Sequence, residues 1–329
     1  MKMNRIKNDS RKTQQKIVHI LIAGLFCLMA FSNPAYPVII SVPDDTIAYF
    51  ASQDTVKLNK VRLAKVVTGV SVAYFGSMSY LQYVWYKDHL RVPFHFYNDS
   101  KGYNQIDKFG HAYGAYLESY IGFHSLLWAG VPRRKAALYG GSIGFLLQFP
   151  IEIWDGMYEG WGFSWSDVAA NTIGSALVVG QELAFQEQAV KYKLSFFPSP
   201  YAAQANGYLG EGVSQFIYDY NGHTYWLSIG VNRIIKSDKI PEWINFALGY
   251  SAGGMFGEFE NKTRYKGVEI PQTERYRQFL LSLDIDFSKI PVRNKNFKKL
   301  LNSMFMIKLP FPAIEINSKS QFRLYPLYY

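Results

Sequence analysis

The chain has 329 residues, of which 49% are hydrophobic, 18% are charged and 17% are aromatic, and its formal net charge is +10. This composition excludes a disordered or fibrous protein, and the length is enough for two ordinary domains with a sizeable core. The mean hydropathy of -0.08 is too low for a chain made mostly of membrane-spanning helices, whereas 25 Tyr and 24 Phe favour a protein of the cell envelope or of a membrane surface.

The N-terminus has the pattern of an export signal, which we assign to residues 1–32. Six basic residues precede the apolar run Ile17–Phe31, and small residues follow where a signal peptidase would cut. Retention of this run as a short anchor is the alternative, although the run is shorter than a bilayer span. A lipid anchor on Cys27 is not expected, because Phe26 stands where a lipoprotein signal needs a small residue.

Removal of the signal would leave 29 basic and 24 acidic residues and no cysteine, because Cys27 is the only one in the chain. The small remaining excess of positive charge does not indicate a nucleic-acid partner. The mature chain is also expected to have no disulfide and no cysteine metal site.

Four helical segments are predicted within residues 58–194, after a loose polar segment at residues 33–57. The first is Lys60–Tyr86, and its part Val66–Tyr86 has no charge and is long enough to span a bilayer. Several Gly and Ser residues make it only weakly apolar, so a helix buried among other helices is an equal alternative. The other three segments are Asp107–Trp128, Arg133–Asp155 and Asp167–Phe185.

Small residues and one proline are expected to shape the packing of these helices. Pairs of Gly and Ala four residues apart lay a stripe of small residues along a helix face and allow backbones to approach. Pro150 is expected to kink or end the third helix, because it has no amide donor. Ser164 and Asp167 have the spacing of a capping box at the start of the fourth. The small-residue pairs are Gly140 and Gly144, Ala170 and Gly174, and Ala176 and Gly180.

Strand and turn chemistry replaces the helical pattern in residues 195–329. The clearest strand is Leu281–Phe287, where apolar residues alternate with Ser282, Asp284 and Asp286, which predicts a buried apolar face and a wet polar face. The predicted fold class is therefore α+β, with an N-terminal helical bundle and a C-terminal strand-rich region. Further strands are expected at His223–Val231, Met304–Leu309, Ala313–Ile316 and Phe322–Tyr329.

Polar residues on three of the predicted helices form the candidate site. Three pairs have spacings of three or four residues, which place both members on one helix face: Asp107 and His111, Glu152 and Asp155, and Asp167 and Asn171. Carboxylates and an imidazole from facing helices can hold a divalent metal or act as an acid–base pair. The alternative is a structural network in which His111 and Lys108 neutralise buried carboxylates. The candidates are Asp107, His111, Glu152, Asp155, Asp167 and Asn171, and the metal ligands would come from His111, Glu152, Asp155 and Asp167.

A basic run in the C-terminal region has no acidic residue beside it and has apolar residues between the charges. This amphipathic pattern favours docking to anionic head groups or to lipid A phosphates, and a solvated charged loop is the alternative. The sequence has no phosphate loop, dinucleotide fingerprint or nucleophile elbow. The basic residues are Lys289, Arg293, Lys295, Lys298 and Lys299.

Three motifs follow one another in the helical region: DKFGH at Asp107–His111, EIWDG at Glu152–Gly156, and GFSWSD at Gly162–Asp167 followed by Asn171 and Gly174. Together they resemble the YfiM-like family of predicted periplasmic lipoproteins, a domain of unknown function. The resemblance covers roughly Asp107–Gln181, and the order of its acidic residues is also similar, more distantly, to VanZ-like membrane proteins. The family is defined by sequence, so the resemblance implies a place in the envelope rather than a reaction. The chain differs from it in its strand-rich C-terminal region and in lacking a lipidation cysteine.

Together these features predict an exported, membrane-associated protein of the cell envelope that faces the periplasm and has a structural or interaction role. Membrane or envelope lipid is the expected partner, and the sequence identifies no protein partner. The alternative is a metal-assisted hydrolase or transferase that acts on an envelope lipid or glycan through the candidate residues. A transport or channel accessory with a polar path between helices is a third hypothesis.

Overall fold

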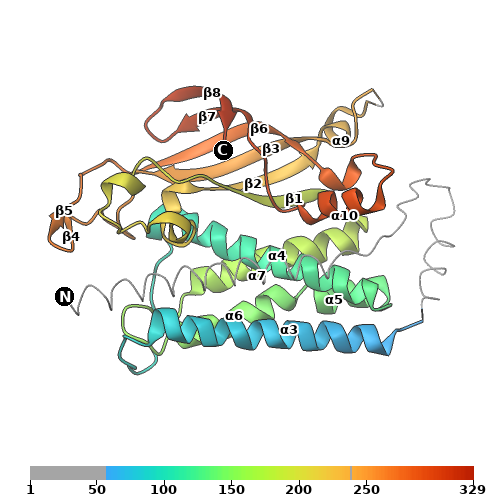
Figure 1. The fold of residues 1–329 in the computed structure, drawn as a ribbon, viewed down its shortest axis with the longest axis horizontal. Coiled ribbons are helices and arrows are strands. Elements are labelled where there is room, and N and C mark those ends of the chain that lie inside the picture. Colours follow the sequence, from blue (N-terminus) through green and yellow to red (C-terminus); the bar gives the residue numbers. More distant parts are fainter. Residues whose placement is uncertain (1–56, 238) are drawn as a thin grey trace.

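The computed structural model describes residues 57–237 and 239–329, which form a layer of helices on one side of an antiparallel sheet (Figure 1). Helices come first in the chain and strands follow, which confirms the predicted α+β class. The predicted signal and most of the loose polar segment lie outside the described residues. The helices of the layer are α3 (Lys60–Leu81), α4 (Ile106–Trp128), α5 (Arg133–Gly140), α6 (Ile143–Asp155) and α7 (Trp165–Phe185), and a π-helical turn, Gln82–Tyr86, continues α3.

The main sheet has six antiparallel strands in the order β1-β2-β3-β6-β7-β8. A separate two-stranded hairpin of β4 (Arg264–Tyr265) and β5 (Val268–Glu269) lies between β3 and β6 in the chain. Three short helices, α8 (Gln215–Tyr218), α9 (Val231–Ile235) and α10 (Lys295–Ser303), connect the strands. The strands of the main sheet are β1 (Val190–Phe196), β2 (His223–Gly230), β3 (Ile244–Gly253), β6 (Tyr276–Ile285), β7 (Phe311–Asn317) and β8 (Phe322–Tyr328).

Glycines allow the helices of the layer to approach α4 closely. A Cβ atom on Gly144 of α6 would lie 2.1 Å from the carbonyl oxygen of Ala115, and one on Gly174 of α7 would lie 2.1 Å from that of Ala112. Any side chain at either position would therefore push its helix away from α4. The same prediction is wrong for Gly180, because no described atom lies within 4 Å of the place where its Cβ would be.

The ends of the helices agree only partly with the sequence pattern. Ser164 is the N-cap of α7, and its hydroxyl accepts a hydrogen bond from the amide of Asp167 at 3.1 Å. The segment predicted as one helix from Arg133 is divided into α5 and α6 next to Gly141, a residue with low helix propensity. Of the two effects predicted for Pro150, the end of the helix is wrong, because α6 continues through it to Asp155, and the kink stays a prediction.

Aromatic side chains join α4 to the sheet. The ring of Phe109 stacks on that of Tyr250 in β3 at 4.3 Å between centroids. Tyr113, one helical turn later, makes edge-on and tilted contacts with Tyr192 of β1 at 5.6 Å and Tyr225 of β2 at 5.8 Å. These rings bury large areas and prefer such geometries, so they fix the position of α4 relative to the strands.

The sheet presents its polar face to the interior, which is the reverse of the prediction. In β6, Ser282 and Asp284 are buried, whereas Leu281 and Leu283 are exposed. The reason is that the sheet curls: the hydroxyl of Thr224 in β2 lies 3.1 Å from that of Tyr328 in β8, although three strands separate them in the sheet order. Alternation in a strand predicts two different faces but not which one the fold encloses.

Ion pairs make this polar interior stable. Lys193 of β1 and Asp284 of β6 form a salt bridge at 2.6 Å, and both side chains are completely buried. Asp284 also accepts a hydrogen bond from Ser228 at 2.6 Å, and Lys191 pairs with Asp286 at 2.5 Å. Since a buried charge is costly without a partner, each strand depends on the charges of the others.

The other strand predictions have mixed outcomes. The strands expected near His223, Ala313 and Phe322 are confirmed as β2, β7 and β8. The strand expected at Met304–Leu309 is wrong, because this segment makes only an isolated bridge between Ile307 and Leu194. β1 begins at Val190, inside the range expected to be helical, and the domain division after residue 194 stays a prediction.

Two described segments are long and apolar enough to cross a membrane, namely Arg133–Asp155 and Trp165–Phe185. In the most apolar 18-residue stretch of each segment, only 39% is buried within the protein. Core helices of soluble proteins share these properties, so length and composition alone do not assign a span. The run Val66–Tyr86, which the sequence offered as a possible span, is not among the described segments that are long and apolar enough to cross a membrane.

The reversed polarity of the sheet leads to an unusual prediction for two neighbouring residues. We expect Asp284→Ala to lower the free energy of unfolding by about 3 kcal/mol, because it leaves the buried ammonium of Lys193 without its carboxylate. Leu283→Ala, on the exposed face, should cost about 1 kcal/mol or less. Chemical denaturation of both variants measures this, and a larger loss for Leu283→Ala would contradict the assignment of the faces.

Candidate functional site

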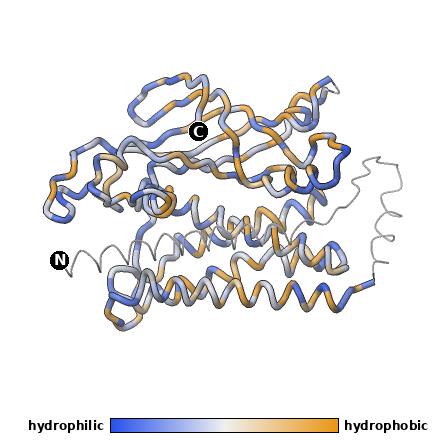
Figure 2. Tube along the Cα trace, in the orientation of Figure 1, coloured by the Kyte–Doolittle hydropathy of each residue, from blue (hydrophilic) through white to orange (hydrophobic). Residues whose placement is uncertain are grey.

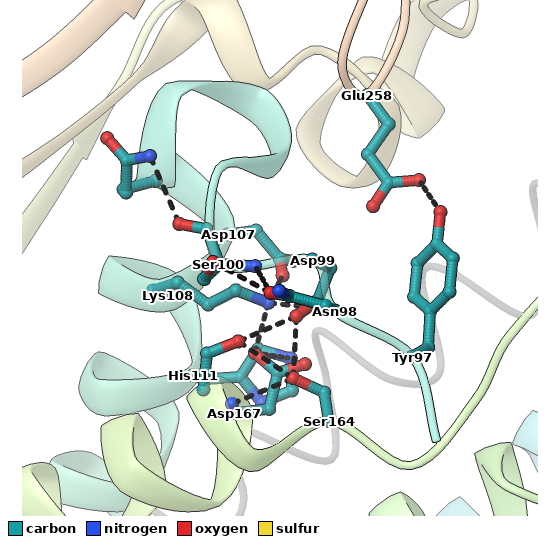
Figure 3. A network of polar contacts seen from close by, with 12 residues as sticks. Tyr97, Asn98, Asp99, Ser100, Asp107, Lys108, His111, Ser164, Asp167 and Glu258 are labelled. Carbon is teal, nitrogen blue, oxygen red and sulfur yellow. Dashed lines mark hydrogen bonds and ion pairs between the residues drawn. The ribbon is translucent and has the colours of Figure 1, made fainter. Parts of the chain in front are cut away.

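A cluster of charged side chains lies at the end of the helical layer where α4 and α7 begin and α6 ends (Figure 3). We call this cluster the polar centre. Its residues come from the connection before α4 and from α4, α6 and α7, so residues from Asp99 to Asn171 meet there. The polar centre consists of Asp99, Asp107, Lys108, His111, Glu152, Asp155, Asp167 and Asn171.

Lys108 occupies the middle of one half of the polar centre (Figure 3). Its ammonium nitrogen lies 2.7 Å from Asp99, 2.8 Å from Asp107 and 2.5 Å from Asp167. Burial alone would lower the pKa of an amine, but Asp107 and Asp167 raise the pKa of Lys108 above its ordinary value. The lysine is therefore a permanent positive charge that three carboxylates share.

Asp99 is fixed by hydroxyl groups as well as by the lysine. Ser164 and Ser166, on both sides of the first residue of α7, donate hydrogen bonds to one of its oxygens at 2.6 and 2.7 Å. Burial alone would raise the pKa of this carboxyl, but the hydrogen bonds from Lys108 and the two serines lower it to about 2. Asp99 is therefore ionised over the whole physiological range.

His111 connects the two halves of the polar centre. Its Nε2 atom lies 3.6 Å from Asp167, and its Nδ1 atom lies 3.4 Å from Glu152 and 3.3 Å from the side-chain oxygen of Asn171. Burial opposes a charge on the ring, but the carboxylates of Asp107, Asp167 and Glu152 raise the pKa of His111 to about 9. The imidazole is consequently protonated near neutral pH.

The carboxyl groups of α6 lie in the more apolar half. Asn171 donates a hydrogen bond to Glu152 at 3.2 Å, and the hydroxyl of Tyr86 donates a short one to Asp155. Burial raises the pKa of Glu152 to about 8 and that of Asp155 to about 7, although His111 lowers both. Near neutral pH both groups can therefore hold a proton, whereas Asp99 is ionised.

The structure brings all six predicted site residues together in this one network. Asp107 and Asp167 contact the lysine, and Glu152, Asp155 and Asn171 surround or adjoin the histidine. The roles proposed for them, catalytic or metal-binding, are not tested by this geometry. Sequence reasoning missed Asp99, Ser166 and Tyr86, because none has a helical spacing to another site residue that would have identified it.

One part of the polar centre has a donor set that suits a divalent metal. One ligand atom each from Asp107, His111 and Asp167 lie within 4.8 Å of one another. Carboxylate and imidazole ligands fit several divalent transition metals. The other two predicted ligands, Glu152 and Asp155, are outside this group, and the ammonium of Lys108 contacts two of its three members.

Comparison with known families supports the resemblance found in the sequence. Residues 95–181, about a quarter of the chain, match the family model of DUF2279, described as a predicted periplasmic lipoprotein. This range includes every residue of the polar centre, and the description agrees with the expected location in the cell envelope. The distant similarity to VanZ-like proteins has no support from it. No match was found among curated proteins or among solved structures.

The pKa of His111 is raised and that of Asp99 is lowered, and these shifts predict how the stability of the folded protein depends on pH. The folded-state pKa of His111 is raised to about 9, so its contribution is complete below about 6.5 and is lost as the pH rises through 9. The folded-state pKa of Asp99 is lowered to about 2, so its contribution is present above about 4 and is lost as the pH falls through 2.

We therefore expect the melting temperature to be highest near pH 4 and to fall as the pH rises towards 9.5, because burial raises the folded-state pKa of Glu152 to about 8 and that of Asp155 to about 7, and the loss from these two groups begins above about pH 4. In His111→Ala the melting temperature should be lower at pH 6, and the part of the decline between pH 6.5 and 9 that depends on His111 should be absent. Thermal denaturation followed by circular dichroism measures both profiles. Identical slopes for the two proteins would show that His111 is not charged in the folded state.

Proposed function

We propose that the protein is an exported, membrane-associated component of the cell envelope that faces the periplasm and has a structural or interaction role. In this proposal the polar centre is a structural network that fixes α4, α6 and α7 relative to one another. The matched family description supports the location. The position of the Lys108 ammonium group, within 2.8 Å of three carboxylates, supports the structural role.

The charge balance of the polar centre favours this role. Lys108 and protonated His111 are two positive charges, and Asp99 and Asp107 with the partly ionised Asp167 oppose them. Burial keeps Glu152 largely protonated, since its pKa is raised to about 8. Lys108 and His111 thus offset most of the negative charge of the network without any added ion, which lowers the cost of burying it.

The network also reaches beyond the segment that matches the family model. Tyr86, at the end of the π-helical turn after α3, donates its hydroxyl to Asp155. Tyr220, in the connection before β2, donates a hydrogen bond to Asp107 at 3.3 Å. The polar centre therefore joins α3 to the other helices of the layer and to the connection before β2, which is what a structural network would do.

Replacement of Lys108 tests the structural role. We expect Lys108→Met to lower the free energy of unfolding by roughly 3 kcal/mol, because it leaves three carboxylates without their shared partner. Lys101→Met, which changes an exposed lysine in the connection before α4, is the matched control and should have almost no effect. A Lys108→Met protein as stable as the control would contradict the proposal.

A metal-assisted hydrolase or transferase acting on an envelope lipid or glycan is the second candidate. The close approach of ligand atoms of Asp107, His111 and Asp167 favours it. A divalent metal bound there would supply a Lewis acid and lower the pKa of a bound water. The raised pKa values of Glu152 and Asp155 would then allow either residue to hold and release a proton near neutral pH.

Metal analysis separates the two candidates. We expect protein purified without added metal to contain far less than one divalent ion per chain, because Lys108 already neutralises the carboxylates. About one ion per chain would favour the enzyme, provided that Asp167→Asn loses it. Glu118→Gln is the control, because Glu118 lies on the same face of α4 but is bonded to Gln148 outside the polar centre, and this variant should keep any ion.

A further inference from the structure

The helix α3 buries little of its surface against the rest of the protein. Of its 22 residues, all of which the structure describes, only Met78 is buried. The helix contains five Val and two Gly residues, which are poor helix formers. Isolated helices are marginal in water and usually depend on packing of one face. An apolar environment around the exposed outer face of α3 would add to the stability of the helix.

The outer face of α3 has the side chains that such an environment requires. Val67, Val72 and Phe75 are exposed by 56%, 68% and 68%. Hydrophobic positions recur along the length of the helix, and hydrophilic ones gather at its N-terminal end (Figure 2). Gly69 and Gly76 face open space, since no described atom lies within 4 Å of where their Cβ atoms would be. These side chains form an exposed apolar patch rather than a single exposed residue, and such a patch indicates a binding surface.

An open groove runs between α3 and α6, next to this face. Its lining has aromatic and apolar side chains with two uncharged polar residues and no carboxylate or ammonium group. Such a lining suits a hydrocarbon chain rather than a polar ligand. On α6 the exposed Leu146 lies one turn before the groove and extends the apolar surface. The groove is lined by Tyr74, Phe75, Met78, Ser79 and Gln82 of α3 and by Pro150 and Trp154 of α6.

The N-terminal end of α3 is strongly basic. Lys60, Arg62 and Lys65 lie in its first two turns, and no acidic residue occurs from position 55 to position 87. Arg62 donates a hydrogen bond to the carbonyl of Trp128 at 3.1 Å, so this end lies beside the connection from α4 to α5. The start of α5 adds Arg134, which is exposed. These charges are complementary to phosphate groups.

The distance between the charges and the groove fits one lipid molecule. Tyr74 follows Lys65 by nine residues, which is about 14 Å along a helix. One leaflet of a bilayer has a hydrocarbon thickness of about 15 Å, half of the roughly 30 Å core. A phospholipid whose phosphate group pairs with the basic end can therefore extend an acyl chain along the outer face of α3 into the groove.

We propose that α3 and the groove beside α6 form a binding surface for anionic phospholipid, with the phosphate at Lys65 and an acyl chain in the groove. This inference rests on the proposed membrane association and names the surface and the class of lipid. Burial of the exposed valines and of Phe75 by hydrocarbon stabilises the complex, and the basic end selects anionic over neutral lipid.

A fluorescent label tests which surface meets the lipid. The mature chain is expected to have no cysteine, so Val72→Cys can be labelled with an environment-sensitive dye, and the unsubstituted chain labelled in parallel measures any signal from Cys27. Leu248→Cys, exposed by 61% on the sheet, is the control. We expect vesicles of phosphatidylglycerol and phosphatidylcholine to increase the emission at position 72 several-fold and shift it to the blue, with no change at position 248.

The outcomes distinguish this inference from the proposed function. Protein that floats with the vesicles while the label at position 72 stays in water would overturn the assignment to α3 but leave membrane association intact. Protein that does not float with any of the vesicles would contradict membrane association itself. Strong blue shifts at position 248 alone would place the lipid on the sheet instead.

The charge requirement has its own test on the same vesicles. Lys65→Ala combined with Arg134→Ala should weaken binding to phosphatidylglycerol vesicles about 25-fold, at roughly fivefold for each basic residue near the surface. Lys262→Ala combined with Lys266→Ala, at the hairpin of β4 and β5, is the matched control and should bind like the unsubstituted protein. Equal affinity of the two double variants would overturn the role of the basic end.

Discussion

The arrangement of the helical layer depends on the ammonium group of Lys108. Three carboxylates from the connection before α4, from α4 and from α7 approach it to within 2.8 Å, and each would repel the others in its absence. Buried charges of one sign are among the most costly features of a folded protein. The lysine converts this repulsion into attraction, so that the start of α4, the start of α7 and the preceding loop can meet at one point.

The same principle governs the sheet. Lys193 and Lys191 of β1 project into the curled interior and pair with Asp284 and with Asp286 just after β6. Removal of one partner from such a pair costs more than the pair itself contributes, because a buried charge is left alone. The helical layer and the sheet therefore have ionic interiors of similar chemistry, and the aromatic contacts of α4 join them without charge.

Much of the helical layer could be predicted, because its signals are local. Three- and four-residue spacings placed Asp107, His111 and Asp167 on the correct helices, and the convergence of those helices followed from the cost of buried carboxylates. The contacts of Asp99 with the start of α7 and of Tyr86 with α6 could not be found this way, because they join residues more than 60 positions apart and neither residue has a helical spacing to another site residue. The polarity of β6 was predicted in reverse, because alternation is symmetric and only the curl of the sheet decides which face is enclosed.

Tyr86 gives the lipid surface and the polar centre a common element. Its ring stacks on Trp154, which lines the groove, while its hydroxyl donates to Asp155 in the polar centre. Only Met78 of α3 is buried, whereas Tyr86, in the π-helical turn that continues α3, is almost completely buried, so this tyrosine helps to attach the C-terminal end of the helix. Lipid that orders α3 would thereby favour the Tyr86 hydrogen bond, and an intact polar centre would in turn hold the groove in shape. Linkage of this kind is reciprocal, so the charge network and lipid binding should stabilise each other.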